Sequence, residues 1–353
     1  MRIGFVGLGN IGGRCARHIL EAGYDLVVAD LDREARQRLV EAGASGASDP
    51  AELAEACDAV LLSLPSPEAS LAVVTGSDGI LSAGSPASVV VDLSTNSAGV
   101  TKRLLEACAA VGVDFIDCPV SGGSMGADAA NLTLMPSGDE AAFNRVKEAL
   151  GCFGNEETEW LGPSGTGTLI KLINNQVFLV GTQGFGEGYL MAAKAGLDLP
   201  KFLEVLRSSS AAFYMPLSEL IVNRQWDDST YDLALAEKDL RLALESAEEI
   251  GTPLPLTRAA HDVLSRSVEM GLGENFFIGA LESLEAEAGF TVPVPSRFRP
   301  GSVPVPSRFR PRRTDGCTRY PRPKQLSDLC ERVPPRGVHP AARAGSGVVA
   351  RAD

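Results

Sequence analysis

Short apolar runs alternate with longer segments of helical periodicity up to about position 160. The apolar runs lie at 3–6, 26–29, 59–65, 88–95 and 113–123. In the segments between them, apolar residues recur every three or four positions, as in a helix that buries one face. Strands that alternate with helices predict crossover units and a parallel, doubly wound α/β sheet. One more apolar run at 131–138 predicts a further strand, in a hairpin-like addition.

The pattern changes after about position 165. Apolar residues keep helical spacing from 168 to about 195, and helical spacing recurs across 200–290. This length of helical pattern without alternating strands predicts an all-helical second part.

The end of the chain differs from both parts. Residues 291–353 hold 13 Lys/Arg against 4 Asp/Glu and 11 of the 22 prolines, and VPVPSRFRP occurs at 292–300 and again at 303–311. Such a composition, with no helical or strand period, predicts a disordered basic tail. Residues 1–290 hold 19 Lys/Arg against 41 Asp/Glu. Their negative charge repels phosphate and argues against a non-enzymatic role in nucleic-acid binding, which the tail alone would suggest.

Composition narrows the class of protein further. The chain is 44% hydrophobic and 22% charged, which is ordinary for a globular protein. Its apolar runs are too short to span a membrane, and residues 1–8 lack the apolar core of a signal peptide. The seven cysteines are scattered without a CxxC pair or partnered histidines. We therefore expect no metal site, no disulfide framework and a location in the reducing cytoplasm.

A glycine-rich segment follows the first strand and opens the first helix. It consists of Gly7, Leu8, Gly9, Asn10, Ile11 and Gly12. The three glycines permit a tight turn, a close approach of the backbone to a pyrophosphate, and close packing of helix on strand. Asp30 closes the second strand, which follows the helix that begins at Gly12. A carboxylate at the end of this strand binds the adenosine ribose in dinucleotide sites. The segment predicts a dinucleotide site; the alternative is a glycine turn without a ligand.

Other candidate residues lie at predicted strand ends, where ligands of such sheets gather. They are Leu64-Pro65, Ser94-Thr95 and Ser121-Gly122-Gly123. The last segment can point successive N–H groups at a substrate carboxylate. The alternative for this segment is a plain tight turn.

One lysine lies in the apolar segment GTGTLIKLINN, residues 165–175. On a helix, Lys171, Asn174 and Asn175 are spaced i, i+3 and i+4 and share one face, whereas Ile173 and Val177 belong to the opposite, apolar face. The segment alone leaves two interpretations open: a lysine that extends to solvent from a helix margin, or a functional amine.

Four segments together resemble the β-hydroxyacid dehydrogenase family, which includes 3-hydroxyisobutyrate dehydrogenase and tartronate semialdehyde reductase. They are GFVGLGNIG (4–12), DCPVSGGSMGA (117–127), GTGTLIKLINN (165–175) and EKDLRLAL (237–244), in the family's order. The resemblance covers about residues 1–289. It implies a Rossmann NAD-binding domain over 1–163 and an all-helical substrate and dimerisation domain over 164–290, joined through a long helix. Cys118, Pro136 and Ser137 depart from the family pattern, and the last two put the regularity of the strand at 131–138 in doubt.

The resemblance also implies roles for individual residues. Lys171 would be the general acid/base, Asn175 and Asn174 would bind substrate, and Thr95 would lie near the nicotinamide or substrate. Lys238 would reach the cofactor region; the alternative is a solvated charge. An ordinary lysine, with a pKa of about 10.4, is a poor base near neutrality. Burial and a neighbouring positive charge lower that pKa, so an isolated amine on an apolar helix can be tuned for proton transfer.

The expected activity is NAD-dependent interconversion of a small 3-hydroxy acid, such as 3-hydroxyisobutyrate, and its semialdehyde. Alternatives are a tartronate semialdehyde reductase and an imine reductase, and Lys171 counts against the second because those relatives usually replace it. Asp30 would repel the 2′-phosphate of NADP, and Leu31 stands where NADP-preferring members tend to have a basic residue, so NAD is expected rather than NADP. We also expect a small substrate that bears a carboxylate, and assembly into a homodimer or homotetramer. No membrane or nucleic-acid partner is expected.

Overall fold

A mostly parallel seven-stranded sheet organises the first part of the chain. The structure is a computed structural model that describes residues 1–226 and 231–294. The strand order is β3-β2-β1-β4-β5-β6-β9, in which only β9 runs antiparallel to its neighbour. The strands are β1 (Arg2–Val6), β2 (Asp25–Ala29), β3 (Ser45–Gly46), β4 (Ala59–Leu62), β5 (Val89–Asp92), β6 (Asp114–Asp117) and β9 (Ser137–Gly138). A separate antiparallel pair consists of β7 (Val120–Ser121) and β8 (Thr133–Leu134).

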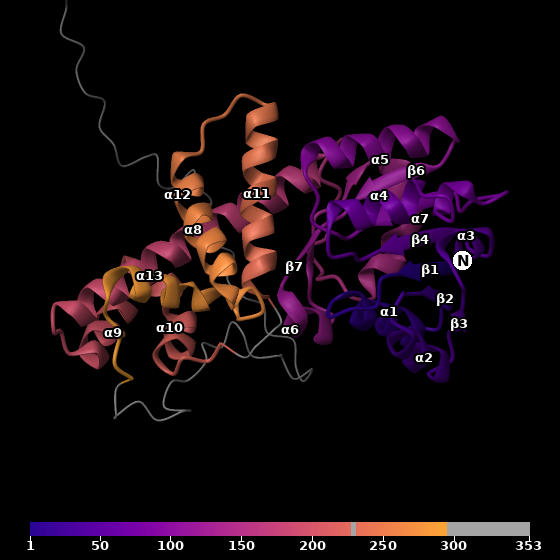
Figure 1. The fold of residues 1–353 in the computed structure, drawn as a ribbon. Coiled ribbons are helices and arrows are strands. Elements are labelled where there is room, and N and C mark those ends of the chain that lie inside the picture. The colour runs from indigo at the N-terminus through magenta and orange to yellow at the C-terminus, as the bar shows by residue number, and fades with distance from the viewer. Residues whose placement is uncertain (227–230, 295–353) are drawn as a thin grey trace, which may run out of the picture. The chain divides into compact units, whose positions relative to one another are not determined.

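Helices cover both faces of this sheet (Figure 1). Because side chains of a strand alternate between faces, Ile3 and Phe5 of β1 join one buried cluster and Val6 joins the other. The first cluster includes α1 (Gly12–Glu21), α2 (Arg33–Glu41) and α7 (Glu140–Gly151). The second includes α3 (Pro50–Glu55), α4 (Pro67–Thr75), α5 (Ala98–Ala110) and the short turn η1 (Ile80–Ser82). Helix α6 (Gly123–Asp128) follows β7.

Only helices follow in the described part of the chain beyond α7. They are α8 (Thr166–Lys194), α9 (Leu199–Arg207), α10 (Met215–Val222), α11 (Leu233–Glu249), α12 (Pro255–Ser267) and α13 (Leu281–Ala288), with the short helical turns η2 (Ser210–Tyr214), η3 (Val268–Leu272) and η4 (Phe277–Ala280). They enclose a second core that includes Leu179, Tyr189, Leu240 and Leu264. Helix α8 supplies residues to this core and contacts α5 and β9 of the sheet part.

The expected fold class is confirmed: a doubly wound sheet is followed by helices, and a 29-residue helix begins the second part. Two expectations about strands needed refinement. The run at 113–123 forms β6 and β7, which flank Pro119, and the run at 131–138 forms β8 and β9, which flank Pro136. Proline cannot donate a ladder hydrogen bond, so each run breaks there. Strand β3 was not predicted because its two residues, Ser45 and Gly46, are exposed and carry no apolar signal.

The domain boundaries and the C-terminal tail are not tested by the described residues. The boundaries at 163/164 and 290/291 remain predictions, and the tail expected over 291–353 lies outside the described residues from position 295. None of the described helices is long and apolar enough to cross a membrane. The cysteines at positions 15, 57, 108, 118 and 152, within the described residues, are free thiols.

Candidate active site

The glycine-rich loop between β1 and α1 has the shape that a pyrophosphate requires. Gly7 has a φ of 91°, and a Cβ atom there would lie 2.3 Å from the carbonyl oxygen of Ser63. A Cβ atom on Gly12 would lie 2.0 Å from the carbonyl oxygen of Gly7, whereas one on Gly9 would meet nothing within 4 Å. Helix α1 has no side-chain cap on its N–H groups and no acidic residue in its first turn. Open space beside a helix start of this kind suits a bound anion.

Asp30 joins the end of β2 to the glycine-rich loop. Its Oδ2 accepts a hydrogen bond from the backbone N–H of Leu8 at 2.5 Å, and its Oδ1 accepts one from Asp32 N–H at 2.7 Å. Each carboxylate oxygen has further acceptor capacity, so both can still bind ribose hydroxyls. The side chain of Leu31, next in the chain, is fully exposed. These two residues fit the adenosine half of a dinucleotide.

The loops after β4 and β5 are joined by a hydrogen bond. Ser94 Oγ accepts from the backbone N–H of Leu64 at 2.9 Å. Ser94 N–H in turn donates to Asp92 Oδ1 at 2.9 Å, and burial raises the pKa of the Asp92 carboxyl. The segment Leu64-Pro65 and the partly exposed Thr95 therefore lie on neighbouring loops at the carboxyl edge of the sheet.

The segment Ser121-Gly122-Gly123 connects β7 to α6. Gly122 and Gly123 have φ angles of 133° and 61°, a region that favours glycine. Both glycines are exposed, and Gly122 is the N-cap of α6 without a side-chain cap on that helix. The segment is therefore a sharp change of chain direction with accessible backbone, as a carboxylate-binding turn requires.

Two of the three polar residues predicted to share a face of α8 are turned toward the protein. Lys171 is partly buried and Asn175 is 7% exposed. On the other side Ile173 and Val177 are each 59% exposed. The inner face of α8 also buries Leu172 and Leu179, so it combines apolar side chains with one amide. The partial burial of Lys171 beside the buried Asn175 favours the interpretation as a functional amine over that of a lysine extending to solvent.

Asp239 of α11 binds several polar side chains close to Lys171. Its Oδ2 accepts hydrogen bonds from Asn175 Nδ2 at 2.6 Å and from the Tyr231 hydroxyl at 2.7 Å. Its Oδ1 lies 3.3 Å from Lys238 Nζ, in an ion pair whose side chains are 5% and 12% exposed. Lys238 Nζ also donates to the carbonyl oxygen of Pro65 at 3.3 Å. Lys238 is therefore no solvated charge, because it connects α11 to the loop after β4.

The surroundings of Lys171 lower the pKa of its amine. Burial lowers the pKa of Lys171; the negative charge of Asp239 opposes this effect and the positive charge of Lys238 adds to it. Burial, together with the neighbouring Asp239, raises the pKa of Tyr231 well above its usual range, so its phenol stays protonated and donates. The cluster thus combines a tunable amine with a fixed donor to the buried carboxylate.

Not every predicted site residue joins this cluster. The side chain of Asn174 is exposed, and its Nδ2 donates to Asn175 Oδ1 at 3.0 Å, so it supports Asn175. Among residues 1–226 and 231–294, no hydrogen bond joins Lys171 to Thr95 or to the Ser121 segment. Asp239 was missed by the sequence reasoning, although it follows Lys238 directly within EKDLRLAL. An acid beside a lysine in an amphipathic helix is ordinarily a surface residue, and only the tertiary structure shows its burial.

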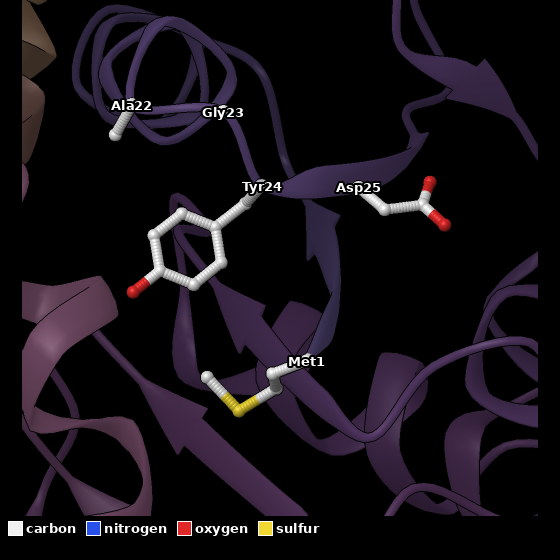
Figure 2. A pocket seen from close by; sticks show the side chains of 5 residues that line it. All are labelled: Met1, Ala22, Gly23, Tyr24 and Asp25. Carbon is white, nitrogen blue, oxygen red and sulfur yellow. The ribbon is translucent and has the colours of Figure 1, made fainter.

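A surface hollow lies away from these residues. It is lined by Met1, Ala22, Gly23, Tyr24 and Asp25, at the start of β1 and β2 (Figure 2). Because β1 and β2 are parallel, this is the amino edge of the sheet, opposite to the edge that bears the glycine-rich loop. No group of three or more His, Cys, Asp or Glu side chains within the described residues is arranged to hold a metal ion.

Comparisons with known proteins agree with this geometry. A family model described as the NAD binding domain of 6-phosphogluconate dehydrogenase matches residues 2–162. A second, described as NAD-binding of NADP-dependent 3-hydroxyisobutyrate dehydrogenase, matches residues 165–279. A probable mitochondrial 3-hydroxyisobutyrate dehydrogenase from Dictyostelium discoideum is 34% identical over 284 residues, which cover 78% of this chain and 88% of that protein.

Two further relatives extend the comparison. A 2-(hydroxymethyl)glutarate dehydrogenase from Eubacterium barkeri is 30% identical over 295 residues, or 83% of this chain and 97% of that protein. The crystal structure of a 3-hydroxyisobutyrate dehydrogenase from Salmonella typhimurium superposes with a TM-score of 0.71 at 27% identity, covering 80% of this chain and 99% of that one.

The dinucleotide loop, the buried amine and these relatives define an NAD(P)-dependent oxidoreductase that acts on a hydroxyl group. Within that class, the chain belongs to the β-hydroxyacid dehydrogenase family.

Proposed function

We propose that this enzyme interconverts a small 3-hydroxy acid, similar to 3-hydroxyisobutyrate, and its semialdehyde, with Lys171 as general acid/base. The observation that supports it most is the amine of Lys171, whose pKa is lowered by burial although the charge of Asp239 opposes this effect. The named dehydrogenases among the relatives support the substrate class. We also propose that residues 1–163 bind the cofactor and 164–290 complete the substrate site.

Lys171 carries the proton-transfer step in this proposal. In the oxidation direction, the neutral Nζ of Lys171 accepts the proton of the substrate hydroxyl. A bound nicotinamide would supply the acceptor for the hydride that leaves the carbon bearing this hydroxyl. In the reduction direction the ammonium form of Lys171 donates a hydrogen bond to the aldehyde oxygen and then its proton. Asp239 holds Asn175 by the 2.6 Å hydrogen bond, and so orients an amide next to the reacting oxygen.

The remaining site residues bind the two ligands. The Ser121-Gly122-Gly123 segment takes the substrate carboxylate through its backbone N–H groups. Asn175 contacts the substrate, Asn174 supports Asn175, and Thr95 lies against the nicotinamide or the substrate.

The cofactor site is proposed to prefer NAD. The pyrophosphate would be held by the loop Gly7, Leu8, Gly9, Asn10, Ile11 and Gly12. Asp30 and Leu31 would hold the adenosine, and Leu64, Pro65, Thr95 and Lys238 would lie toward the nicotinamide. A carboxylate at the ribose repels a 2′-phosphate. Within the described residues, neither Asp30 nor Asp32 forms an ion pair with a basic side chain. Asp30 accepts backbone N–H groups, and Asp32 caps α2.

The assembly and location are also proposals. The exposed Ile173 and Val177 on α8 support a homodimer or homotetramer. We propose a cytoplasmic location, on the scattered cysteines of the sequence.

The test measures the turnover of a panel of small hydroxy acids and semialdehydes by the parent protein and its Lys171→Ala variant. The change in NADH absorbance reports the rate. We expect 3-hydroxyisobutyrate-like substrates to give the highest kcat/KM, and Lys171→Ala to lower kcat by about 10² to 10⁴-fold while NADH affinity stays nearly unchanged. Lys171→Arg should fail as well, since a guanidinium does not release its proton near neutrality. A Lys171→Ala variant that keeps a tenth of kcat would refute the assignment of the base.

A further inference from the structure

The start of helix α8 is held by a buried carboxylate from the sheet. Asp117, the last residue of β6, is 2% exposed. Its Oδ1 accepts from Gly165 N–H at 2.9 Å and from the Ser164 hydroxyl at 3.1 Å. Its Oδ2 accepts from Thr168 N–H at 2.9 Å and from the Thr168 hydroxyl at 3.0 Å. One side chain therefore binds four donors at the first turn of α8.

The other free N–H groups of this turn are also satisfied by groups outside the helix. Gly167 N–H donates to Ser137 Oγ of β9 at 2.8 Å, and Thr166 N–H donates to the Pro163 carbonyl at 3.2 Å. The first regular helical bond is that of Leu169 N–H to Gly165. Ser137 is one of the departures from the family pattern, and its hydroxyl supplies one of these bonds.

Close packing prevents the same turn from moving toward the sheet. A Cβ atom on Gly167 would lie 2.0 Å from the Met135 carbonyl oxygen and 3.2 Å from the Asp117 carbonyl oxygen. The backbone of α8 is thus in contact with the strand ends, while Asp117 and Ser137 prevent it from moving away. Asp117 is itself fixed, because the next residue, Cys118, donates its N–H to the Asp92 carbonyl at 2.8 Å.

Lys171 is located three positions, less than one helical turn, after Thr168. We propose that Asp117 is a positioning residue, which fixes the first turn of α8 against the carboxyl edge of the sheet and thereby sets the place of Lys171 relative to the cofactor and substrate. The proposal rests on the proposed function of Lys171. The negative charge of Asp117 also faces the positive end of the helix dipole, so the contact combines hydrogen bonding with favourable electrostatics.

A purely stabilising role predicts different behaviour from a positioning role. A cap that only stabilises would lower the melting temperature when removed, and the surviving folded enzyme would keep its kcat and the pKa of Lys171. A positioning cap affects the folded enzyme itself, because a misplacement of about 1 Å costs up to about a hundredfold in rate. Freed from Asp117, the turn would also let the amine reach water, and the pKa of Lys171 would rise toward its ordinary value.

The experiment uses Asp117→Asn and Asp117→Ala in the full chain, with Asp198→Asn as the control. Asp198 caps a different helix, α9, by accepting from Lys201 N–H at 3.2 Å. Competitive labelling of lysines across a pH series, read by mass spectrometry, gives the pKa of Lys171 without any enzymatic assay. Steady-state kinetics give kcat and the KM for NAD, and hydrogen exchange follows the amides of residues 165–171.

We expect Asp117→Asn, which retains one acceptor oxygen, to lower kcat about tenfold and Asp117→Ala about a hundredfold, with the KM for NAD within about twofold of the parent. The pKa of Lys171 should rise in both variants and stay the same in Asp198→Asn. If neither Asp117 variant folds, Ser137→Gly, which removes only the bond to Gly167, should show the same changes at smaller size.

An unchanged Lys171 pKa in the folded Asp117 or Ser137 variants would overturn the proposal, as would faster exchange at 165–171 with an unchanged kcat. Failure of the proposed function gives another result: the parent enzyme would not turn over hydroxy acids, while the labelling would still decide whether Asp117 positions Lys171.

Discussion

At the scale of single residues, the environment of Lys171 is defined by Asp239 and Lys238, which act in opposite directions. Burial and the charge of Lys238 lower the pKa of the amine, whereas Asp239 raises it. Asp239 in turn is shared among Asn175, Tyr231 and Lys238. The lysine itself was predicted from its segment and family resemblance. Its carboxylate partner was not, since the burial of Asp239 depends on contacts with the distant Asn175 and with Tyr231, which precedes α11.

This environment predicts the pH dependence of both reaction directions. In the proposed mechanism, oxidation needs the neutral amine of Lys171, so kcat/KM for the hydroxy acid should rise with pH through the pKa of Lys171, which lies below the ordinary 10.5. Reduction needs the ammonium form, so its rate should fall through the same value. Profiles measured in both directions with one substrate pair test this. Replacing Lys238 by Met removes a positive neighbour and should move both limbs to higher pH; limbs that move to lower pH would contradict the assignment.

Asp30 and Leu31 carry the second prediction at this scale. NAD should be preferred over NADP by at least about tenfold in kcat/KM, or roughly 1.4 kcal/mol at the transition state. The double variant Asp30→Asn with Leu31→Arg removes the repelling charge and adds a cation, so it should narrow or reverse the ratio. Arg33, at the start of α2, is the nearest native cation along the chain. If the unmodified enzyme prefers NADP, the ribose interpretation of Asp30 is wrong.

At the scale of elements, α8 shows both the success and the limit of sequence reasoning. Its bounds, Thr166–Lys194, agree with the expected start at 168 and end near 195. Periodicity gives a helix and its two faces, but it does not say which face is inside. Asn175 can be buried because Asp239 accepts its amide hydrogen bond, and Asp239 is held in turn by the Tyr231 hydroxyl. Both residues come from another part of the sequence.

The outward apolar face of α8 leads to a prediction about assembly. Ile173 and Val177 are each 59% exposed, and a second protein surface would remove them from water. The double variant Ile173→Lys with Val177→Glu should shift sedimentation velocity toward the monomer. Val111→Lys, at a 54% exposed position at the end of α5, is the matched control and should leave the assembly unchanged. An Ile173/Val177 variant that sediments like the parent would place the interface elsewhere.

At the scale of the whole molecule, the nucleotide-binding half was the more predictable one. Local signals define it: a strand, a glycine-rich turn, a helix and an acid at the next strand end follow one another directly along the chain, from Arg2 to Asp30. The proposed substrate side was less predictable, since it is assembled from α8 and from the segment of Tyr231 and α11, and these two segments are far apart in the sequence. The contacts at the first turn of α8 could not be predicted either, because Asp117 and Ser137 lie within the two runs that were predicted as strands.

The buried amine of Lys171 has a thermodynamic consequence for the entire fold. Its pKa is lower in the folded protein than in the unfolded chain, so unfolding takes up protons at pH values between these two pKa values. The contribution of Lys171 therefore opposes folding most strongly below its folded pKa, weakens as pH rises, and vanishes above about 10.5. Lys171→Met, which keeps the volume and removes the charge, should raise the melting temperature at pH 7 and lose this advantage in alkaline solution. Calorimetry of the two proteins at both pH values would measure the stability that is lost by burying this amine.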